Sequence, residues 1–183
     1  MERNQALELL KQHLKSENLI NHSLAVEAIM RGIAERLDQD EDKFGLAGLL
    51  HDIDYDTTAE DFHQHSLLGA QILKENGLPE DIVYAVKVHN EVHGLPRQSL
   101  LDHALYAADP VSGFITAAAL VRPDKKLEQV QLKSLKKRFK EKAFAKAANR
   151  EQMQTCSELG LELEDFLQLC LESMKKIASD IAL

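Results

Sequence analysis

The chain has 183 residues, of which 44% are hydrophobic and 28% charged, with only 4 Pro and 8 Gly. These values fit one compact domain, rich in helix formers, of a size that a single hydrophobic core can hold together. The formal net charge of -8 argues against a protein that binds nucleic acid through its surface as a whole.

No segment of the sequence resembles a targeting or membrane-spanning element. Residues 1–15 are polar and amphipathic, unlike a signal peptide, and the most apolar stretch, Gly113 to Val121, is far too short to cross a bilayer. Cys156 and Cys170 lie on different predicted helices with no second ligand at metal-binding spacing, so we interpret both as reduced packing residues. We therefore expect a cytoplasmic protein.

Helical periodicity runs along the whole chain, and no alternating run of β-branched residues is long enough for a sheet. The first half predicts helices at about 4–15, 18–37, 42–52, 62–75 and 79–90. An acidic, non-periodic segment separates the third helix from the fourth, and Asn76 and Gly77 end the fourth.

The second half of the chain begins with a linker at 94–98. A long helix follows from about Ser99 to residue 122, and Pro110 could bend it. Further helices are predicted at 132–140, 149–159 and 162–181, the second of them with Asn149 as its N-cap. We expect an all-α fold with no internal repeat.

Histidines and aspartates form an ordered series in the first two-thirds of the chain. The potential metal ligands lie on different predicted helices, in the order His22, His51, Asp52, His65, His89 and Asp109. Ligands spread in this way can converge in the core of a helical bundle. Imidazole and carboxylate suit iron, zinc, manganese or nickel, and a carboxylate can also bridge two ions.

Taken singly, these residues predict little. A histidine beside apolar neighbours, such as His22, is more often a hydrogen-bonded core residue than a ligand, and Asp109 could be a turn residue before Pro110. The adjacent His51 and Asp52 point about 100° apart on a regular helix, but at a helix end both can turn toward one ion. Such an end is expected there, between an apolar run and the acidic segment.

Taken together, these segments resemble the HD superfamily of metal-dependent hydrolases, in its HDIG-type branch. The run Gly-Leu-Ala-Gly-Leu-Leu-His-Asp-Ile-Asp at 45–54 resembles the family signature, and 21–26, 65–70, 86–90 and 104–109 resemble the pieces that accompany it. The resemblance implies a single domain, 1–183: an HD-domain helical bundle with a metal-binding core at about 18–122 and a C-terminal helical extension at about 123–183.

The same resemblance implies one divalent ion held by His22, His51, Asp52 and Asp109. A second ion would be held by His65 and His89, with Asp52 as a bridge. The sequence departs from the family pattern at Asp54, Tyr55 and Asn90, where relatives have Gly, Lys and, in some two-metal members, a second His. One or two divalent ions are therefore expected, and Fe, Mn, Zn, Ni and Mg are not distinguished.

The resemblance also implies a phosphohydrolase that acts on a nucleotide or another small phosphorylated metabolite by metal-activated water, with Asp52 at its centre. Asp54 is a candidate to pass a proton to the leaving oxygen, with Asp56 and His93 as alternatives. A solvated acidic turn is the other interpretation of the two aspartates.

Candidate contacts to the phosphate of a substrate are Lys87 and Arg122. The basic run that continues to about residue 142 is either an ordinary solvated helix face or a part of this phosphate site. With no Trp, 3 Tyr and 6 Phe, the chain has too few aromatic residues for a nucleic-acid stacking platform. We expect a small phosphorylated partner, no nucleic-acid polymer and no membrane.

Three other functions stay open at this point. They are a cyclic-nucleotide phosphodiesterase, a di-iron oxygenase such as occurs among relatives with the same ligand order, and a non-catalytic regulatory module. An oxygenase would require oxygen and ferrous iron, whereas a regulatory module would carry little metal whether or not Asp52 is intact. The sequence does not reveal the oligomeric state.

Overall fold

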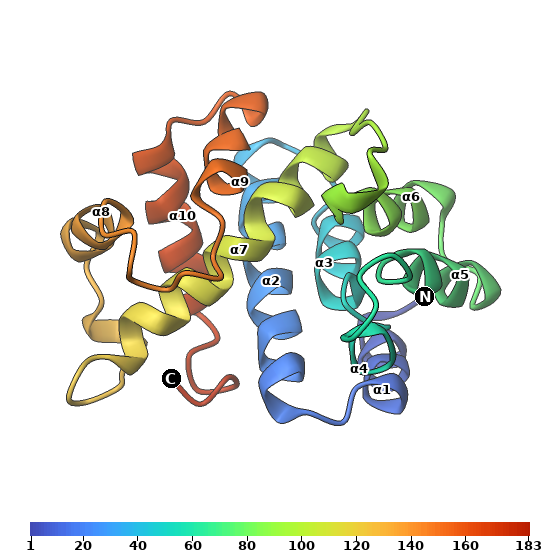
Figure 1. Cartoon of the computed structure of the whole chain (residues 1–183), viewed down its shortest axis with the longest axis horizontal. Helices are drawn as coiled ribbons and strands as arrows, with labels where there is room; N and C mark the ends of the chain where they lie inside the picture. The colour runs from blue at the N-terminus through green and yellow to red at the C-terminus, as the bar shows by residue number, and fades with distance from the viewer.

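The computed structural model describes all 183 residues, and every regular element in it is helical (Figure 1). The first half contains α1 (Arg3–His13), α2 (Glu17–Arg36), α3 (Glu41–Leu50), α4 (Tyr55–Thr58), α5 (Leu67–Glu75) and α6 (Glu80–Val88). The second half contains α7 (Leu100–Leu120), α8 (Leu132–Phe139), α9 (Arg150–Gln154) and α10 (Leu163–Lys175), and short 3-10 turns lie at Glu91–His93, Leu127–Gln129 and Thr155–Leu159. The prediction of an all-α helical bundle is confirmed.

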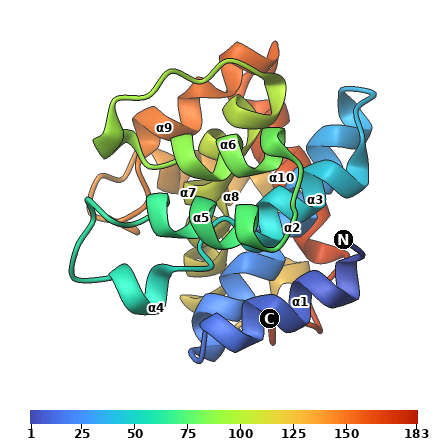
Figure 2. The ribbon, with the colours of Figure 1, turned by 90° about the vertical axis from the view of Figure 1, so that its right-hand side faces the viewer.

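The long helices α2 and α7 form the centre of the bundle. Helix α2 packs against α3, α7 and α10, and α7 crosses the molecule from α6 toward α8 (Figure 1). Helices α5 and α6 lie at one end, and the view from that end shows α4 at the edge below α5 (Figure 2). None of these helices combines the length and the apolar character that crossing a membrane requires.

One continuous core joins the N-terminal helices to the C-terminal extension. Buried apolar side chains from α1 through α10 belong to a single cluster. Its largest members include Phe114 on α7 and Phe166 on α10, neither of which has any exposed surface. The extension therefore packs as part of the same core, and the domain boundaries stay a prediction.

Pro110 lies inside α7 instead of ending it. Because proline has no N–H, the carbonyl of Tyr106, four residues earlier, loses its helical partner. The side chain of Gln152 on α9 replaces it, since its Nε2 donates to this carbonyl at 2.8 Å. This bond ties α9 to the middle of α7, next to Asp109.

Two predicted helix boundaries were wrong. The helix expected at 62–75 begins only at Leu67, because Ser66 has a left-handed backbone with φ of 70° and the residues before it form turns. The helix expected at 162–181 ends at Lys175, after which the chain continues in turns. The predicted cap at Asn149 is confirmed, because its Oδ1 accepts from the N–H groups of Glu151 and Gln152.

Candidate metal centre

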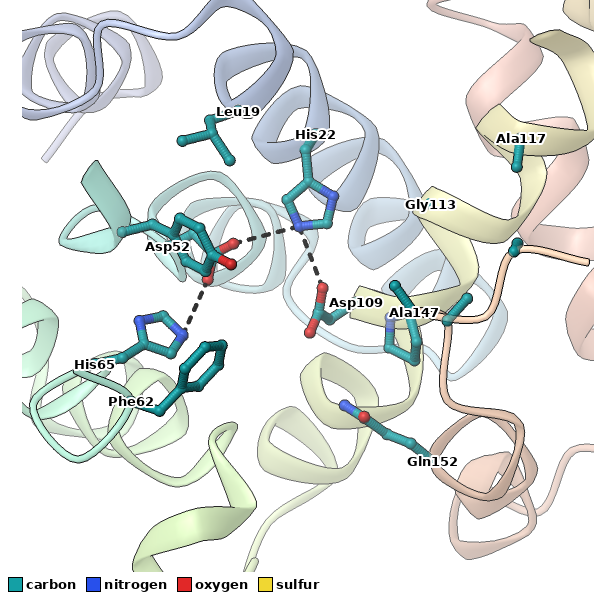
Figure 3. A pocket seen from close by; sticks show the side chains of 14 residues that line it. Leu19, His22, Asp52, Phe62, His65, Asp109, Gly113, Ala117, Ala147 and Gln152 are labelled. Atoms are coloured by element: carbon teal, nitrogen blue, oxygen red, sulfur yellow. Dashed lines mark ion pairs between the residues drawn. The ribbon is translucent and has the colours of Figure 1, made fainter. Parts of the chain in front are cut away.

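Six side chains from separate parts of the chain meet between α2, α3, α5, α6 and α7. They are His22 in α2, His51 and Asp52 at the end of α3, His65 in the turn before α5, His89 at the end of α6, and Asp109 in α7. Figure 3 shows four of them, with Asp52 between His22 and His65 and with Asp109 on the other side of His22. The third helix ends as the sequence predicts, at the His51-Asp52 pair.

The first group of atoms contains the Nε2 atoms of His22 and His51 and one oxygen from each of Asp52 and Asp109. His22 Nε2 lies 3.1 Å from His51 Nε2, 3.4 Å from Asp52 Oδ2 and 3.2 Å from Asp109 Oδ1. His51 Nε2 lies 3.3 Å from Asp52 Oδ2 and 3.7 Å from Asp109 Oδ1. The ligand atoms of His22, His51 and Asp52 all lie within 4.8 Å of one another, close enough to hold one ion, and Asp109 Oδ1 lies within 3.7 Å of both imidazoles.

The other oxygen of Asp52 faces a second group of atoms. Asp52 Oδ1 lies 3.4 Å from His65 Nε2 and 3.5 Å from His89 Nε2. The two clusters, one on each side of this carboxylate, could each hold a metal ion. A carboxylate placed in this way can bridge two ions.

The hydrogen bond made by the outer ring nitrogen of each histidine determines which nitrogen faces the cluster. His51 Nδ1 donates to the Gly48 carbonyl at 2.9 Å, and His89 Nδ1 donates to the Val86 carbonyl at 2.6 Å. Because a carbonyl can only accept, Nδ1 carries the proton in both rings. In the neutral ring the inner nitrogen, Nε2, therefore presents a lone pair.

Side chains play the same part for the other two imidazoles. His65 Nδ1 donates to Asp54 Oδ1 at 2.9 Å. His22 Nδ1 donates to Ser112 Oγ at 2.9 Å, because that hydroxyl already donates its own proton to the Asp109 carbonyl. In their neutral form, all four imidazoles thus turn lone pairs toward carboxylate oxygens, an arrangement that a cation between them stabilises. The residues fit a metal site.

The charges within this cluster also change its proton affinity. Burial by itself lowers the pKa of His22, but its hydrogen bonds to Asp109 and Asp52 raise that pKa to about 9. The pKa of His51 is likewise raised despite burial, chiefly by the charge of Asp52. Although burial favours the neutral acids, the neighbouring histidines hold the pKa of Asp52 and of Asp109 well below the usual range. The cluster therefore attracts positive charge.

Asp54 is buried and lies outside the ion cluster. Its Oδ1 accepts from His65, and its Oδ2 accepts from the N–H groups of Ser66 and Gly69, at 2.8 Å each. Gly69 permits this approach, because a Cβ there would lie 3.3 Å from the Asp54 carboxyl carbon. With both oxygens engaged, Asp54 is not a solvated turn residue, which was one of the two interpretations of the sequence. It does not line the cavity above the cluster, so its position does not support the other interpretation, a proton donor to the leaving oxygen. It orients His65.

The other two candidates for proton transfer also lie elsewhere. Asp56 is exposed and accepts from the backbone N–H of Lys15 at 2.6 Å. His93 places its Nε2 2.8 Å from the carbonyl of His65, and so supports the turn that carries this ligand. Neither side chain lines the cavity above the cluster.

The structure brings neither predicted phosphate contact to the cluster. Lys87 stands two positions before His89 on α6, about 200° away around the helix, and it does not line the cavity. Arg122 follows the end of α7, roughly 20 Å along the helix axis from Asp109, and pairs with Asp124 at 3.1 Å. Sequence order alone did not show on which side of α6, or how far along α7, these cations lie.

A cavity of about 610 Å³ opens over the cluster (Figure 3). Its floor is formed by His22, Asp52, His65 and Asp109, one wall by Leu19, Tyr55 and Phe62, and the facing wall by Ala147, Ala148 and Gln152. No Ser, Thr, Cys, Lys or Arg side chain lines it. Burial, together with the charges of Asp52 and Asp109, raises the pKa of the Tyr55 phenol, which therefore keeps its proton at neutral pH.

Sequence reasoning missed both walls of this cavity. A signal for Phe62 was present, since it is a large apolar residue directly after an acidic, non-periodic segment. In the structure this residue is 52% exposed. The sequence around Ala147, Ala148 and Gln152 gave no local signal that these residues line the cavity. Their approach to the cluster depends on a tertiary hydrogen bond, between Gln152 and the Tyr106 carbonyl.

The sequence of this chain is similar to that of known proteins. Residues 19–113 match the family model described as HD domain. Ribonuclease Y from Nitratidesulfovibrio vulgaris is 31% identical over 169 residues, which cover 91% of this chain and 32% of that protein. Ribonuclease Y from Aquifex aeolicus is 31% identical over 170 residues, covering 91% and 30%. The chain thus spans about a third of the length of the curated relatives it matches.

These relatives overturn the prediction about partners. A small phosphorylated molecule was expected and a nucleic-acid polymer excluded, but the relatives are named as ribonucleases. The net charge does not exclude such a partner, because the basic residues concentrate in the last third of the chain. The exclusion of a membrane partner is withdrawn as well, since the match leaves two-thirds of those proteins without a counterpart. The cytoplasmic location stays a prediction.

Proposed function

Because this chain belongs to the HD domain family, as its motifs predict, we propose that it is a metal-dependent phosphodiesterase that hydrolyses the backbone of RNA. One observation carries the proposal: Asp52 lies on the floor of an open cavity and turns one oxygen toward each of two histidine groups. The ribonuclease activity for which these relatives are named supports RNA as the class of substrate.

In this proposal His22, His51, Asp52 and Asp109 hold one divalent ion, and His65 and His89 share Asp52 to hold a second. Such ions supply an activated water and neutralise the charge that develops on the phosphate oxygens. The chain itself keeps the imidazoles in the required tautomer through the partners of their Nδ1 atoms. Because no hydroxyl of Ser or Thr and no thiol lines the cavity, water is favoured over a protein nucleophile.

Two neutral donors of the cavity are available to the substrate. Tyr55 offers an O–H that its raised pKa keeps protonated, and Gln152 contributes a side-chain amide to the facing wall. We assign Tyr55 the role of hydrogen-bond donor to an oxygen of the scissile phosphate. Asp54 is a positioning residue, because it acts only through His65.

The test measures hydrolysis of two probes, a short single-stranded oligoribonucleotide and bis(p-nitrophenyl) phosphate. The protein is stripped with a chelator and then loaded in turn with Mn²⁺, Fe²⁺, Zn²⁺, Ni²⁺ or Mg²⁺. Hydrolysis should disappear on stripping and return with at least one ion. Asp52→Ala should abolish both metal retention and hydrolysis, whereas Lys137→Ala, on the exposed face of α8, should leave both nearly intact.

Three results would contradict the proposal. The first is that the metal-loaded protein hydrolyses neither probe with any of the five ions. Turnover that requires oxygen and ferrous iron would instead indicate an oxygenase. A small metal content that Asp52→Ala leaves unchanged would indicate a regulatory module.

A further inference from the structure

A second hollow, of about 890 Å³, adjoins the cavity at the turn that precedes α9. Ala147 and Ala148 line both spaces, so the two hollows lie on either side of this turn. Beyond the turn the second hollow is lined by three exposed lysines, Lys140, Lys142 and Lys146, and by one acidic residue, Glu151. Only this turn thus separates the cavity over the metal centre from a set of cations.

These lysines belong to a segment whose charge differs from that of the rest of the molecule. Between residues 132 and 146 there are seven Lys or Arg residues and one Glu, in a chain of net charge -8. Lys136 pairs with Glu164, but Lys140, Lys142 and Lys146 form no ion pair. Unpaired cations gathered in an acidic protein fit a polyanionic partner.

The turn between the two spaces has a fixed shape. The guanidinium of Arg150 donates to the carbonyls of Phe144, Ala145 and Ala148. Arg150 also faces the ring of Phe114, with its guanidinium carbon 4.8 Å from the ring centre. Arg150 is therefore engaged in holding the turn, and the three lysines are the free cations of the second hollow.

On the facing wall of the cavity, an exposed aromatic ring is held in place. Phe62 is 52% exposed, and its ring lies edge to face with Tyr55 and His65, with centres 6.4 and 5.9 Å apart. Asn90 fixes this turn, because its Nδ2 donates to the carbonyls of Phe62 and His65 at 2.9 and 3.2 Å. A positioned aromatic ring with a free face can stack on a nucleic-acid base.

The two walls differ in the part of a nucleotide that they suit. Glu60 and Asp61 directly precede Phe62 in the chain and are exposed, so the negative charge beside this wall disfavours phosphate. The facing wall leads to Lys140, Lys142 and Lys146, which attract it. In Figure 3, Phe62 and Ala147 lie on opposite sides, with Asp109 between them.

We propose that the two spaces form one binding track for single-stranded RNA. The backbone lies along Lys140, Lys142 and Lys146, crosses the turn at Ala147 and Ala148, and reaches the metal centre. There the base next to the scissile phosphate stacks on Phe62. A duplex does not suit this track, because its paired and stacked bases expose no face to the ring. The inference rests on the proposed function and adds the path of its substrate.

The cationic part is tested by the fluorescence anisotropy of a labelled single-stranded oligoribonucleotide of about ten nucleotides. Chelator keeps the strand uncut during the titration. The triple variant Lys140→Gln, Lys142→Gln, Lys146→Gln should bind at least about ten-fold more weakly. Its slope of log affinity against log salt should be less steep by about 2, since each lost phosphate contact on a single strand contributes about 0.7.

The matched control removes the same charge from neighbouring exposed positions outside both hollows: Lys126→Gln, Lys133→Gln, Lys137→Gln. This variant should bind with nearly unchanged affinity and salt slope. Equal losses in the two triple variants would show a diffuse attraction and overturn the track. Tighter binding of a duplex of the same length would overturn it too.

The aromatic part is tested at Phe62 with the same probe. Phe62→Ala should weaken binding about five-fold or more, Phe62→Leu should weaken it similarly, and Phe62→Trp should retain it, because only an aromatic face stacks. Equal affinities of all three variants would overturn the stacking role. Thermal unfolding of each variant checks that the fold is retained.

The two proposals fail in different ways. If the wild-type protein hydrolyses bis(p-nitrophenyl) phosphate but does not bind the oligoribonucleotide, the track is wrong and the phosphodiesterase centre stands. If it binds the strand in the expected way but hydrolyses neither probe, the phosphodiesterase proposal is wrong and the surface is a binding site alone.

Discussion

At the scale of single residues, the four imidazoles of the cluster depend on two kinds of partner. His51 and His89 donate to carbonyls three residues earlier in their own helices, so their orientation is set as soon as those helices end. His65 depends on the side chain of Asp54, which comes from another element. His22 depends on a hydroxyl of α7, Ser112. Only the second kind of partner can be removed by a side-chain substitution.

Asp54→Asn should therefore weaken one half of the metal centre. The amide turns an NH₂ group toward the N–H groups of Ser66 and Gly69, or toward His65 Nδ1, so one of these donors faces another donor. We expect about a ten- to hundred-fold loss of metal affinity at the His65 and His89 site. Calorimetric metal titration measures it. Asp56→Asn, at an exposed position, is the matched control, and an equal loss in both variants would contradict the role of Asp54.

The pH dependence of metal binding follows from the pKa of His22, which is about 9 against an ordinary value of 6.5. In the ion-free protein this imidazole is protonated below about pH 9, so ions compete with the proton and metal affinity should rise from pH 6.5 to 9. The contribution of His22 to the stability of the ion-free protein has the opposite sign. It is complete below pH 6.5 and is lost as pH rises through 9.

Calorimetry in two buffers with different heats of protonation measures this competition. Each ion bound near pH 7 should release at least one proton, and fewer should be released above pH 9. A metal affinity that stays constant across this range, with no proton release, would show that His22 does not titrate as its surroundings indicate.

At the scale of helices, the irregular points of the chain build the site. Pro110 frees a carbonyl in the middle of α7, and α9 is attached there through Gln152. The left-handed backbone at Ser66 interrupts the region before α5, and this places His65 and Phe62 in a turn beside the cavity. Regular helices at both places would leave the cavity without its walls.

Gln152→Ala should lower the free energy of unfolding by about 1–3 kcal/mol, because the Tyr106 carbonyl would lose its remaining partner. Chemical denaturation monitored by circular dichroism measures this change. Gln154→Ala, two residues further along α9 and exposed, should change it little. Equal stability of the two variants would mean that water replaces the lost bond without cost.

The contrast between regular and irregular elements explains what could be predicted from the sequence. Local patterns placed the end of α3 at the His51-Asp52 pair and the cap of α9 at Asn149. The break at Ser66 was missed, because Asp54 stabilises it through bonds to backbone groups distant in sequence. Lys87 and Arg122 were predicted to contact the phosphate of a substrate, but neither lines the cavity. Spacing along the chain does not reveal which face of a helix meets the site.

At the scale of the whole molecule, the extension and the metal-binding region share one core. Helix α10 packs on both α2 and α7, the helices that carry His22 and Asp109. Phe166 on α10 is fully buried in the cluster that also contains residues of α3 and α6. Loss of packing at the C-terminal end should therefore reach the metal centre.

Phe166→Ala should lower the free energy of unfolding by about 3–5 kcal/mol, the usual cost of removing a buried aromatic ring. In this variant, metal release and loss of helix should occur at the same denaturant concentration. Metal content and circular dichroism, measured on the same samples, check this expectation. Retention of metal after α10 has unfolded would show that the two regions are independent.

Asp52 has one further consequence, which concerns how the centre fills. Its oxygens serve both clusters, so an ion on either side restricts the rotamer on which the other side depends. The first ion to bind already orders the Asp52 side chain, so binding of the second ion does not carry this entropic cost again. This favours the second ion after the first has bound. Loading should therefore be cooperative, with the empty and the doubly occupied protein more populated than independent sites would allow.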